Sequence, residues 1–331
     1  MATMKDVAKL ANVDISTVSR ALNNSAYVHP DTKSKVLAAV KELSYQPNIL
    51  AQGLKKGKRH TIGVVLPKLH MDIFSEILQG IEKQARMHQY STIICTTEDN
   101  PSVEKEILNR LRVGFIDGLL IAGTGKNNRI LRDMNADGMS IVQIVRNQET
   151  KLSSVIANYE TSAYEATKFL FKKGSRCISL INGNMELAPY RDRYSGYRNA
   201  TIELGLDEIH IESHGNPNTF EYGYNSTIEL LKYNTNIDAI MVAVDIQGIG
   251  VLRALKDLNI DVPNNIKVIS LTGHSVGNML ETSMTAMEIP ANEMGEKSSS
   301  MLIDKIENQK NGRIGVQHLT FQAVLTERES T

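Results

Sequence analysis

The stretch MKDVAKLANVDISTVSRALN, residues 4–23, has the apolar spacing of two short amphipathic helices joined by a tight turn. The residues expected to face each other are Val7, Leu10 and Ala11 in the first helix, Val13 in the turn, and Val18 and Leu22 in the second helix. A third helix beginning at Pro30 and Asp31 would close the core with Val36, Leu37, Val40 and Leu43. Residues 1–46 are therefore predicted to form a three-helix domain containing a helix-turn-helix.

The second helix of this unit presents a polar face made of Ser16, Thr17, Ser19, Arg20 and Asn23. Short hydrogen-bonding side chains and a guanidinium suit base edges and phosphate oxygens in a major groove. The same pattern permits a helical hairpin inside a larger core. The short turn and the polar outward face favour the DNA-binding interpretation.

Charge is divided unevenly along the 331 residues, although the formal net charge is zero. Residues 1–60 hold ten Lys or Arg and four Asp or Glu, so they carry +6 and the remainder carries −6. A basic head on an acidic body concentrates phosphate attraction in the head.

Three blocks occur in order along the chain: DVAKLANVDISTVSRALNN (6–24), YQPNILAQGL (45–54) and TIGVVLP (61–67). On these blocks the chain resembles the LacI/GalR family of bacterial transcriptional repressors, and the resemblance continues to the C-terminus. It implies a homodimer on a pseudo-palindromic operator in double-stranded DNA, controlled by a small sugar or sugar phosphate. A co-repressor-dependent or global carbon-catabolite regulator of the same family is the alternative. The candidate DNA-contacting residues are Thr3, Ile15, Ser16, Thr17, Arg20, Asn23, Tyr27, Thr32, Asn48, Ala51, Leu54 and Lys55.

Residues 47–60 are expected to form a hinge helix and linker. Pro47 forces an extended entry, Gly53 weakens the short helix 48–54, and a basic run follows, so this segment should be barely stable alone. By resemblance it pairs with its twin from a second subunit, and Leu54 is the wedge that enters the minor groove and kinks the duplex. A plain flexible linker is the alternative.

Residues 61–331 alternate short apolar strands with helical segments, which predicts doubly wound parallel α/β sheets. Strands are expected at TIGVVL, STIICT, DGLLIA, SIVQIV, VIAN, RCISLI, AIMVAV and KVISLT. Helices are expected near 72–88, 101–113, 127–135, 160–173, 193–205, 220–233, 246–258 and 291–309, followed by a strand around 314–319. The resemblance implies a two-lobed core like that of periplasmic sugar-binding proteins. Lobe 1 would hold about 61–157 and 291–319, and lobe 2 about 158–290 and 320–328.

Ligands of open α/β lobes bind beyond the carboxyl ends of the strands, here between the lobes. The candidate effector-binding residues are Lys68, His70, Thr124, Arg146, Asn158, Arg193, Asp245 and Thr272. Arg193 and Asp245 match the family's effector-binding arginine and aspartate. Val244, Thr272 and Ala157 depart from its usual Asn, Asp and Asp, which predicts a cationic cleft and a phosphorylated sugar bound by Lys68 and Arg146, as in trehalose-operon repressors.

The strongest rival function is a serine hydrolase, because Gly273-His274-Ser275-Val276-Gly277 reads G-x-S-x-G after a predicted strand. Only His318 follows as a possible base, so the protein is expected not to be an enzyme. The two cysteines, Cys95 and Cys177, suggest neither a disulfide framework nor a zinc site, and neither a cofactor nor a metal is expected. No signal peptide or membrane span is recognised, which predicts a cytoplasmic protein rather than a sugar-transport protein.

Overall fold

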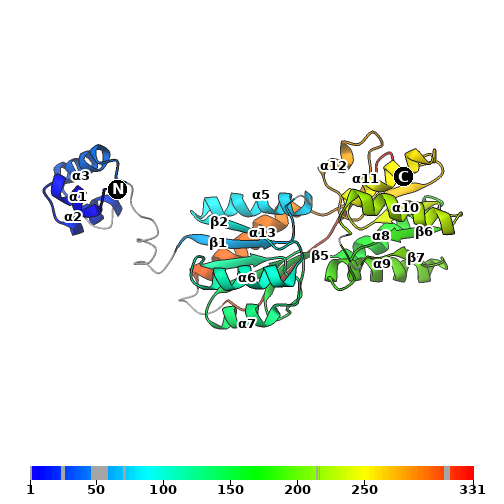
Figure 1. Ribbon diagram of the computed structural model, residues 1–331, viewed down its shortest axis with the longest axis horizontal. Helices are drawn as coiled ribbons and strands as arrows, with labels where there is room; N and C mark the ends of the chain where they lie inside the picture. The colour runs from blue at the N-terminus through cyan, green and yellow to red at the C-terminus, as the bar shows by residue number, and fades with distance from the viewer. Residues whose placement is uncertain are drawn as a thin grey trace. The chain divides into compact units, whose positions relative to one another are not determined.

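The computed structural model describes residues 2–23, 27–45, 59–69, 72–213, 215, 217–308 and 314–331, without the side chains of Asn23 and Asp72. The chain divides into two compact units, a head of residues 1–59 and a body of residues 60–331. Figure 1 shows the helices of the head and the two α/β lobes of the body. The predicted fold class is confirmed, with helices in the head and two mainly parallel sheets in the body.

The head consists of α1 (Met4–Leu10), α2 (Ile15–Asn23) and α3 (Pro30–Glu42). Its core is centred on three fully buried valines, Val7, Val18 and Val36, surrounded by buried alanines. Two predicted core residues, Leu10 and Leu37, lie instead on the surface, 45% and 48% exposed. Ala8 and Ala39, which the sequence did not predict as core residues, are buried instead, because small side chains let short helices approach closely.

Lobe 1 of the body is a six-stranded sheet in the order β11-β5-β4-β3-β1-β2. Its helices α5 and α13 pack on one face, and α6 and α7 on the other (Figure 1). Its elements are β1 (Thr61–Leu66), α5 (Asp72–Met87), β2 (Ser91–Thr96), α6 (Pro101–Arg112), β3 (Gly118–Ile121), α7 (Asn128–Ala136), β4 (Ser140–Ile144), β5 (Ser153–Ala157), α13 (Ala291–Glu307) and β11 (His318–Phe321).

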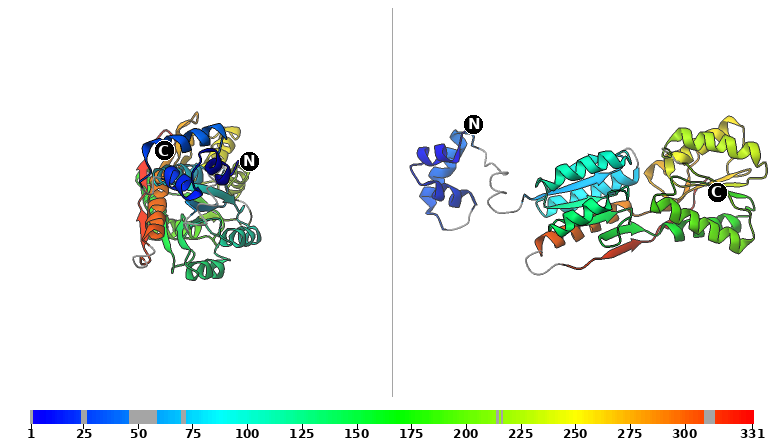
Figure 2. Two further views of the ribbon diagram at one scale, coloured as in Figure 1. Left: turned by 90° about the vertical axis from the view of Figure 1, so that its left-hand side faces the viewer. Right: turned by 60° about the horizontal axis from the view of Figure 1, so that its bottom comes forward.

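Lobe 2 repeats this architecture with the strand order β12-β10-β9-β8-β6-β7. Helices α8 and α9 pack on one face of the sheet, and α10 and α11 on the other (Figure 2). Its elements are α8 (Tyr159–Lys172), β6 (Ile178–Ile181), α9 (Ala188–Leu204), β7 (Ile209–Ile211), α10 (Phe220–Tyr233), β8 (Ala239–Val242), α11 (Asp245–Asp257), β9 (Lys267–Ser270), α12 (Ser275–Asn278), β10 (Thr285–Glu288) and β12 (Val324–Thr326).

The last strands correct the sequence prediction in two respects. The strand expected around 314–319 lies at His318–Phe321 and pairs with β5, so the chain enters lobe 2 after residue 321 rather than after 319. The following β12 pairs antiparallel with β10. The strands β7, β10 and β12 were not predicted, because they are short and lie outside the longer apolar runs that marked the other strands. β7 and β12 also lie at sheet edges, where their side chains are partly exposed.

Helix α13 returns to lobe 1 and packs closely on α5 through a pair of glycines. A Cβ added at Gly80 would lie 2.0 Å from the Asn292 carbonyl oxygen, and one added at Gly295 would lie 2.1 Å from the Ile77 carbonyl oxygen. Since backbone atoms cannot rotate away as side-chain ends can, the contact requires both glycines.

We therefore expect Gly295→Ala to lower the stability of the body by roughly 1–3 kcal/mol through overpacking. Urea unfolding of the full chain, followed by circular dichroism, measures this. Gly315→Ala is the matched control, because a Cβ at that position has no atom within 4 Å. Equal midpoints for the two variants would show that α5 and α13 can separate without cost.

Candidate functional sites

The outer surface of the head begins at the first residue of α2. Ile15 is 44% exposed, and Ser16 and Arg20 are exposed beside it, one helical turn apart. The Arg20 guanidinium donates from Nη2 to the Ser16 hydroxyl at 3.1 Å and from Nε to the Ser16 carbonyl at 3.3 Å. These contacts hold the Arg20 cation on the exposed face of α2, and the first turn of α2 carries no acidic residue. Such a face suits the negatively charged phosphates of a nucleic acid.

Other predicted head residues lie around this face, with different local roles. Thr3 caps α1: its amide and its hydroxyl each donate to the Asp6 carboxylate at 2.7 Å. These hydrogen bonds lower the pKa of Asp6. Tyr27 is 83% exposed, whereas Thr17 and Thr32 are partly buried. The predicted contacts Asn48, Ala51, Leu54 and Lys55, the side chain of Asn23, and His70 in the body lie outside the described residues.

In the body, a pocket lies between lobe 1 and lobe 2 at the carboxyl ends of the strands. It is lined by Ile73, Phe74, Val145, Arg146, Tyr159, Pro189, Tyr190, Arg193, Val244 and Thr272. Its cavity measures about 20 Å³, enough for roughly one water molecule and far below the several hundred Å³ of a typical ligand site. The lobes must therefore separate, or the lining side chains must move, before a sugar can enter.

Arg193 is one of the two arginines that line this pocket. It is 3% exposed, and its guanidinium carbon lies 4.5 Å from the ring centre of Tyr159 and 5.6 Å from that of Tyr190. Its Nε finds no hydrogen-bond partner among the described residues, and burial lowers the pKa of Arg193. A buried cation that lies against aromatic faces keeps N–H donors for whatever enters the pocket.

The packing of α8 against α9 explains how Arg193 reaches the Tyr159 ring. Gly196 lies one turn after Arg193, and a Cβ there would be 2.0 Å from the Glu160 carbonyl oxygen. Only glycine permits this separation, which brings the start of α8 under the first turns of α9. Tyr159 is the first residue of α8, directly after Asn158, whose side chain caps the helix by accepting from the Thr161 amide at 3.1 Å.

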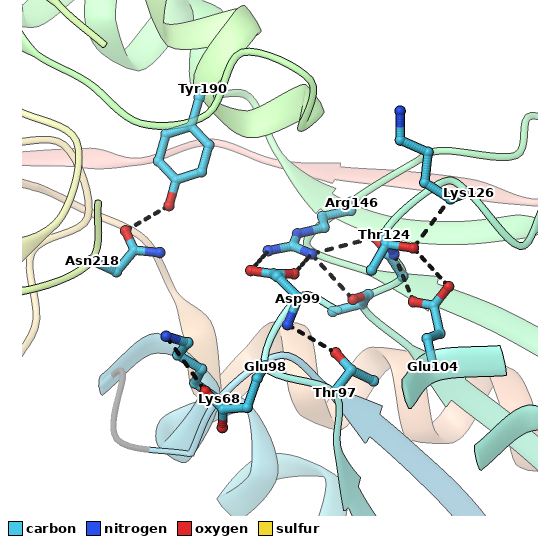
Figure 3. A network of polar contacts seen from close by, with 12 residues as sticks. Lys68, Thr97, Glu98, Asp99, Glu104, Thr124, Lys126, Arg146, Tyr190 and Asn218 are labelled. Carbon is cyan, nitrogen blue, oxygen red and sulfur yellow. Dashed lines mark hydrogen bonds and ion pairs between the residues drawn. The ribbon is translucent and has the colours of Figure 1, made fainter. Parts of the chain in front are cut away.

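The Arg146 side chain forms a two-pronged ion pair with Asp99 in lobe 1. One guanidinium nitrogen donates to Asp99 Oδ1, and the other donates to Oδ2 at 3.1 Å. Burial acts to lower the pKa of Arg146, but the Asp99 carboxylate outweighs it and raises the pKa. Figure 3 shows this pair with Tyr190 and Asn218, whose side chains are hydrogen-bonded at 2.7 Å, on the opposite side of the cleft.

Lys68 is likewise paired, since its Nζ lies 3.5 Å from Glu98 Oε2. The prediction of a cationic cleft is therefore wrong for the described residues, because it counted Lys68 and Arg146 and omitted the carboxylates that neutralise them. Glu98 and Asp99 closely follow β2. The strand-end rule that selected the other candidates would have found both.

The remaining effector candidates bind partners within the protein. Asp245 accepts from the Thr272 hydroxyl at 3.1 Å and from the amides of Gly273 and His274 at 3.3 and 3.1 Å. Thr124 donates through its amide and its hydroxyl to the buried Glu104 carboxylate, at 2.7 and 2.8 Å. Of the eight predicted residues, Arg146, Arg193 and Thr272 line the pocket. The sequence reasoning missed Tyr159 and Tyr190, because it searched for polar groups only.

Among the described residues, one ion pair and one histidine–carboxylate contact connect the lobes. Lys126 Nζ in lobe 1 lies 3.1 Å from Glu186 Oε2 in lobe 2. His274 Nδ1 in lobe 2 lies 3.2 Å from Glu76 Oε2 on α5, a contact that is an ion pair only when the imidazole is protonated. A ligand that separates the lobes has to break such contacts or lengthen them.

The G-x-S-x-G segment does not form a nucleophile elbow. Ser275 begins the four-residue α12, and the preceding His274 contacts Glu76. His318, the one histidine later in the chain, lies on β11 in lobe 1 with its Nδ1 2.8 Å from the Ser154 hydroxyl.

No group of three potential metal ligands occurs among the described residues. Within the same residues, no helix is both long enough and apolar enough to cross a membrane.

Comparison with known proteins covers both units. The family model "Bacterial regulatory proteins, lacI family" matches residues 3–48, and "Periplasmic binding proteins and sugar binding domain of LacI family" matches residues 59–323. Over 343 residues the chain is 32% identical to the HTH-type transcriptional regulator RegA of Clostridium saccharobutylicum, with 100% of both chains covered. It is 29% identical over 333 residues to the ribose operon repressor of Escherichia coli strain K12, again with 100% of both covered.

A third relative is catabolite control protein A of Staphylococcus xylosus, 30% identical over 303 residues and 91% of each chain. Among solved structures, a lac repressor dimer bound to operator and an anti-inducer has a TM-score of 0.87 at 22% identity. The match covers 100% of this chain and 99% of that one. That likeness concerns the fold.

Proposed function

The chain belongs to the LacI family of bacterial regulatory proteins and is therefore a DNA-binding transcriptional regulator; we propose that it represses a carbohydrate-utilisation operon and is controlled by a small sugar or sugar phosphate bound between its lobes. It acts in the cytoplasm as a homodimer on a pseudo-palindromic operator, since one short helix reads few base pairs and two-fold proteins pair with two-fold sites. In this proposal Leu54 is the minor-groove wedge.

The observation that carries the effector assignment is Arg193, a buried guanidinium between two tyrosine rings that forms no ion pair with a carboxylate among the described residues. Sugar hydroxyls both donate and accept hydrogen bonds, and the faces of sugar rings are apolar enough to lie against aromatic rings. Arg193 donors, the Tyr159 and Tyr190 rings and the Asp99 carboxylate match these two properties.

Such a ligand acts on the head only if it binds one arrangement of the lobes more tightly than another. Entry into the 20 Å³ cavity requires rearrangement, so binding and lobe geometry are coupled. A typical coupling free energy of about 1–3 kcal/mol corresponds to a change of roughly 5- to 150-fold in operator affinity.

The operator for this test is obtained by selecting, from a random pool, the DNA duplexes that the purified full-length chain binds. Fluorescence anisotropy then gives its dissociation constant with and without candidate sugars, and analytical ultracentrifugation gives the stoichiometry. We expect a two-fold symmetric consensus, two chains per duplex, and weaker binding when the correct sugar is present. Arg20→Ala should weaken binding to every sequence and reduce the salt dependence, because it removes a backbone contact.

The alternative regulator, in which the ligand is a co-repressor, rests on the similarity to catabolite control protein A. The same anisotropy titration separates the two, because a co-repressor tightens operator binding. Selection of non-symmetric sites bound by one chain would contradict the proposed function in either form.

A further inference from the structure

The loop after β2 places two consecutive carboxylates against two cations of lobe 1, Lys68 and Arg146. Glu98 and Asp99 both have positive φ values, 51° and 56°, a backbone conformation that residues with side chains adopt infrequently. This conformation brings Asp99 onto Arg146 and Glu98 to 3.5 Å from Lys68. Two successive residues held in such a conformation at a cleft point to a role in what the cleft binds.

We propose that Asp99 determines effector specificity: its carboxylate occupies the anion position on Arg146, so the pocket selects uncharged polyhydroxyl sugars and rejects phosphorylated ones. This inference rests on the proposed function of the pocket. It replaces the expectation from the sequence that Arg146 and Lys68 bind a phosphate.

The two partners of this ion pair differ in their exposure to the cleft. Arg146 is 4% exposed, whereas the Asp99 side chain is 26% exposed, so the carboxylate is the more accessible member. Arg146 also lies 3.4 Å from the carbonyl oxygens of Ala122 and Gly123, which are further acceptors. A ligand approaching from the cleft therefore meets a guanidinium whose two terminal nitrogens already donate to partners in the protein.

A carboxylate accepts hydrogen bonds and donates none, so it suits sugar hydroxyls. At neutral pH a phosphate group carries at most one hydrogen that it can donate to this carboxylate. Like charges at hydrogen-bonding distance also repel strongly where water is excluded. Phosphate can pair with Arg146 only by displacing this two-pronged carboxylate contact, which is among the stronger polar contacts in proteins. Arg193 remains the donor that a neutral ligand's oxygens can use.

Removing only the charge of Asp99 should reverse this preference. In Asp99→Asn the shape is kept while Arg146 becomes a buried, uncompensated cation that a phosphate can pair with. We expect the ratio of affinities, phosphorylated sugar over its parent, to rise at least about tenfold, the change that corresponds to 1.4 kcal/mol.

The test is isothermal titration of the full-length protein with four matched pairs: ribose and ribose 5-phosphate, glucose and glucose 6-phosphate, trehalose and trehalose 6-phosphate, and sucrose and sucrose 6-phosphate. Asp137→Asn is the matched control. It also frees an arginine, Arg112, but Arg112 lies on the surface and, unlike Arg146, does not line the pocket. The double variant Asp99→Asn/Arg146→Gln removes both charges and should lose the gain in phosphate affinity.

Tighter binding of a neutral sugar by the wild type, with the ratio reversed in Asp99→Asn alone, supports the proposal. Wild-type protein that binds the phosphate as tightly as its parent, or an unchanged ratio in Asp99→Asn, overturns it. If Asp99→Asn does not fold, the ratio of the two affinities measured for the wild type still tests the proposal. If the wild type binds neither sugars nor sugar phosphates from a broader panel, the proposed function is refuted instead.

Discussion

Replacing Arg193 by methionine is expected to abolish the response to the effector while leaving operator binding within about twofold of the wild type. Hydrogen bonds to a charged group contribute about 1.5–3 kcal/mol each. Losing two of them would weaken sugar binding by roughly 100-fold or more, since each 1.4 kcal/mol is tenfold. Isothermal titration measures the sugar affinity, and operator anisotropy with added sugar measures the response.

The stability of this variant separates a ligand contact from a packing role. Burial lowers the pKa of Arg193, so the folded protein disfavours the charged form, and removing the charge should leave the melting temperature unchanged or higher. Methionine keeps an apolar chain between Tyr159 and Tyr190. Arg191→Met is the matched control, because Arg191 lies on α9 two residues away and is exposed. Wild-type sugar affinity in Arg193→Met would exclude Arg193 from the ligand contact.

Val18→Asn is expected to abolish operator binding without affecting sugar binding. Val18 is fully buried with Val7 and Val36. The substitution removes the burial of a valine, about 1.5–3 kcal/mol, and leaves an amide without partners, about 1–3 kcal/mol. A head of this size has only about 2–7 kcal/mol of stability, so it should unfold while the separate core of the body stays intact.

Leu37→Asn is the control for this prediction, because Leu37 lies in the same head and is 48% exposed. It should retain helical circular dichroism and operator binding, whereas Val18→Asn should lose part of the helical signal and keep the unfolding transition of the body. Loss of sugar binding in Val18→Asn would mean that the two units do not fold independently.

The elements of the body could be predicted well where a strand or helix is long and strongly patterned. The strands Thr61–Leu66 and Ser91–Thr96 and the helix Phe220–Tyr233 lie where the sequence predicted them. The short strands β7, β10 and β12 could not be predicted, because they lack the longer apolar runs that predicted strands of similar length, such as β3 and β8. Their pairing depends on neighbouring strands that come from distant parts of the chain.

The sequence by itself determined the head and the alternation of strands and helices, because local periodicity carries that information, and the resemblance to the family selected Arg193. Only the tertiary structure decided the charge of the pocket. Whether Arg146 is a free cation depends on Asp99, which lies 47 residues away and reaches Arg146 through the fold of lobe 1. Likewise, Asp245 is occupied by the loop after β9, and the Tyr159 ring lies under Arg193 because Gly196 lets α8 and α9 touch. A residue's type limits the chemistry it can perform, but its free hydrogen-bonding capacity depends on partners that folding brings together.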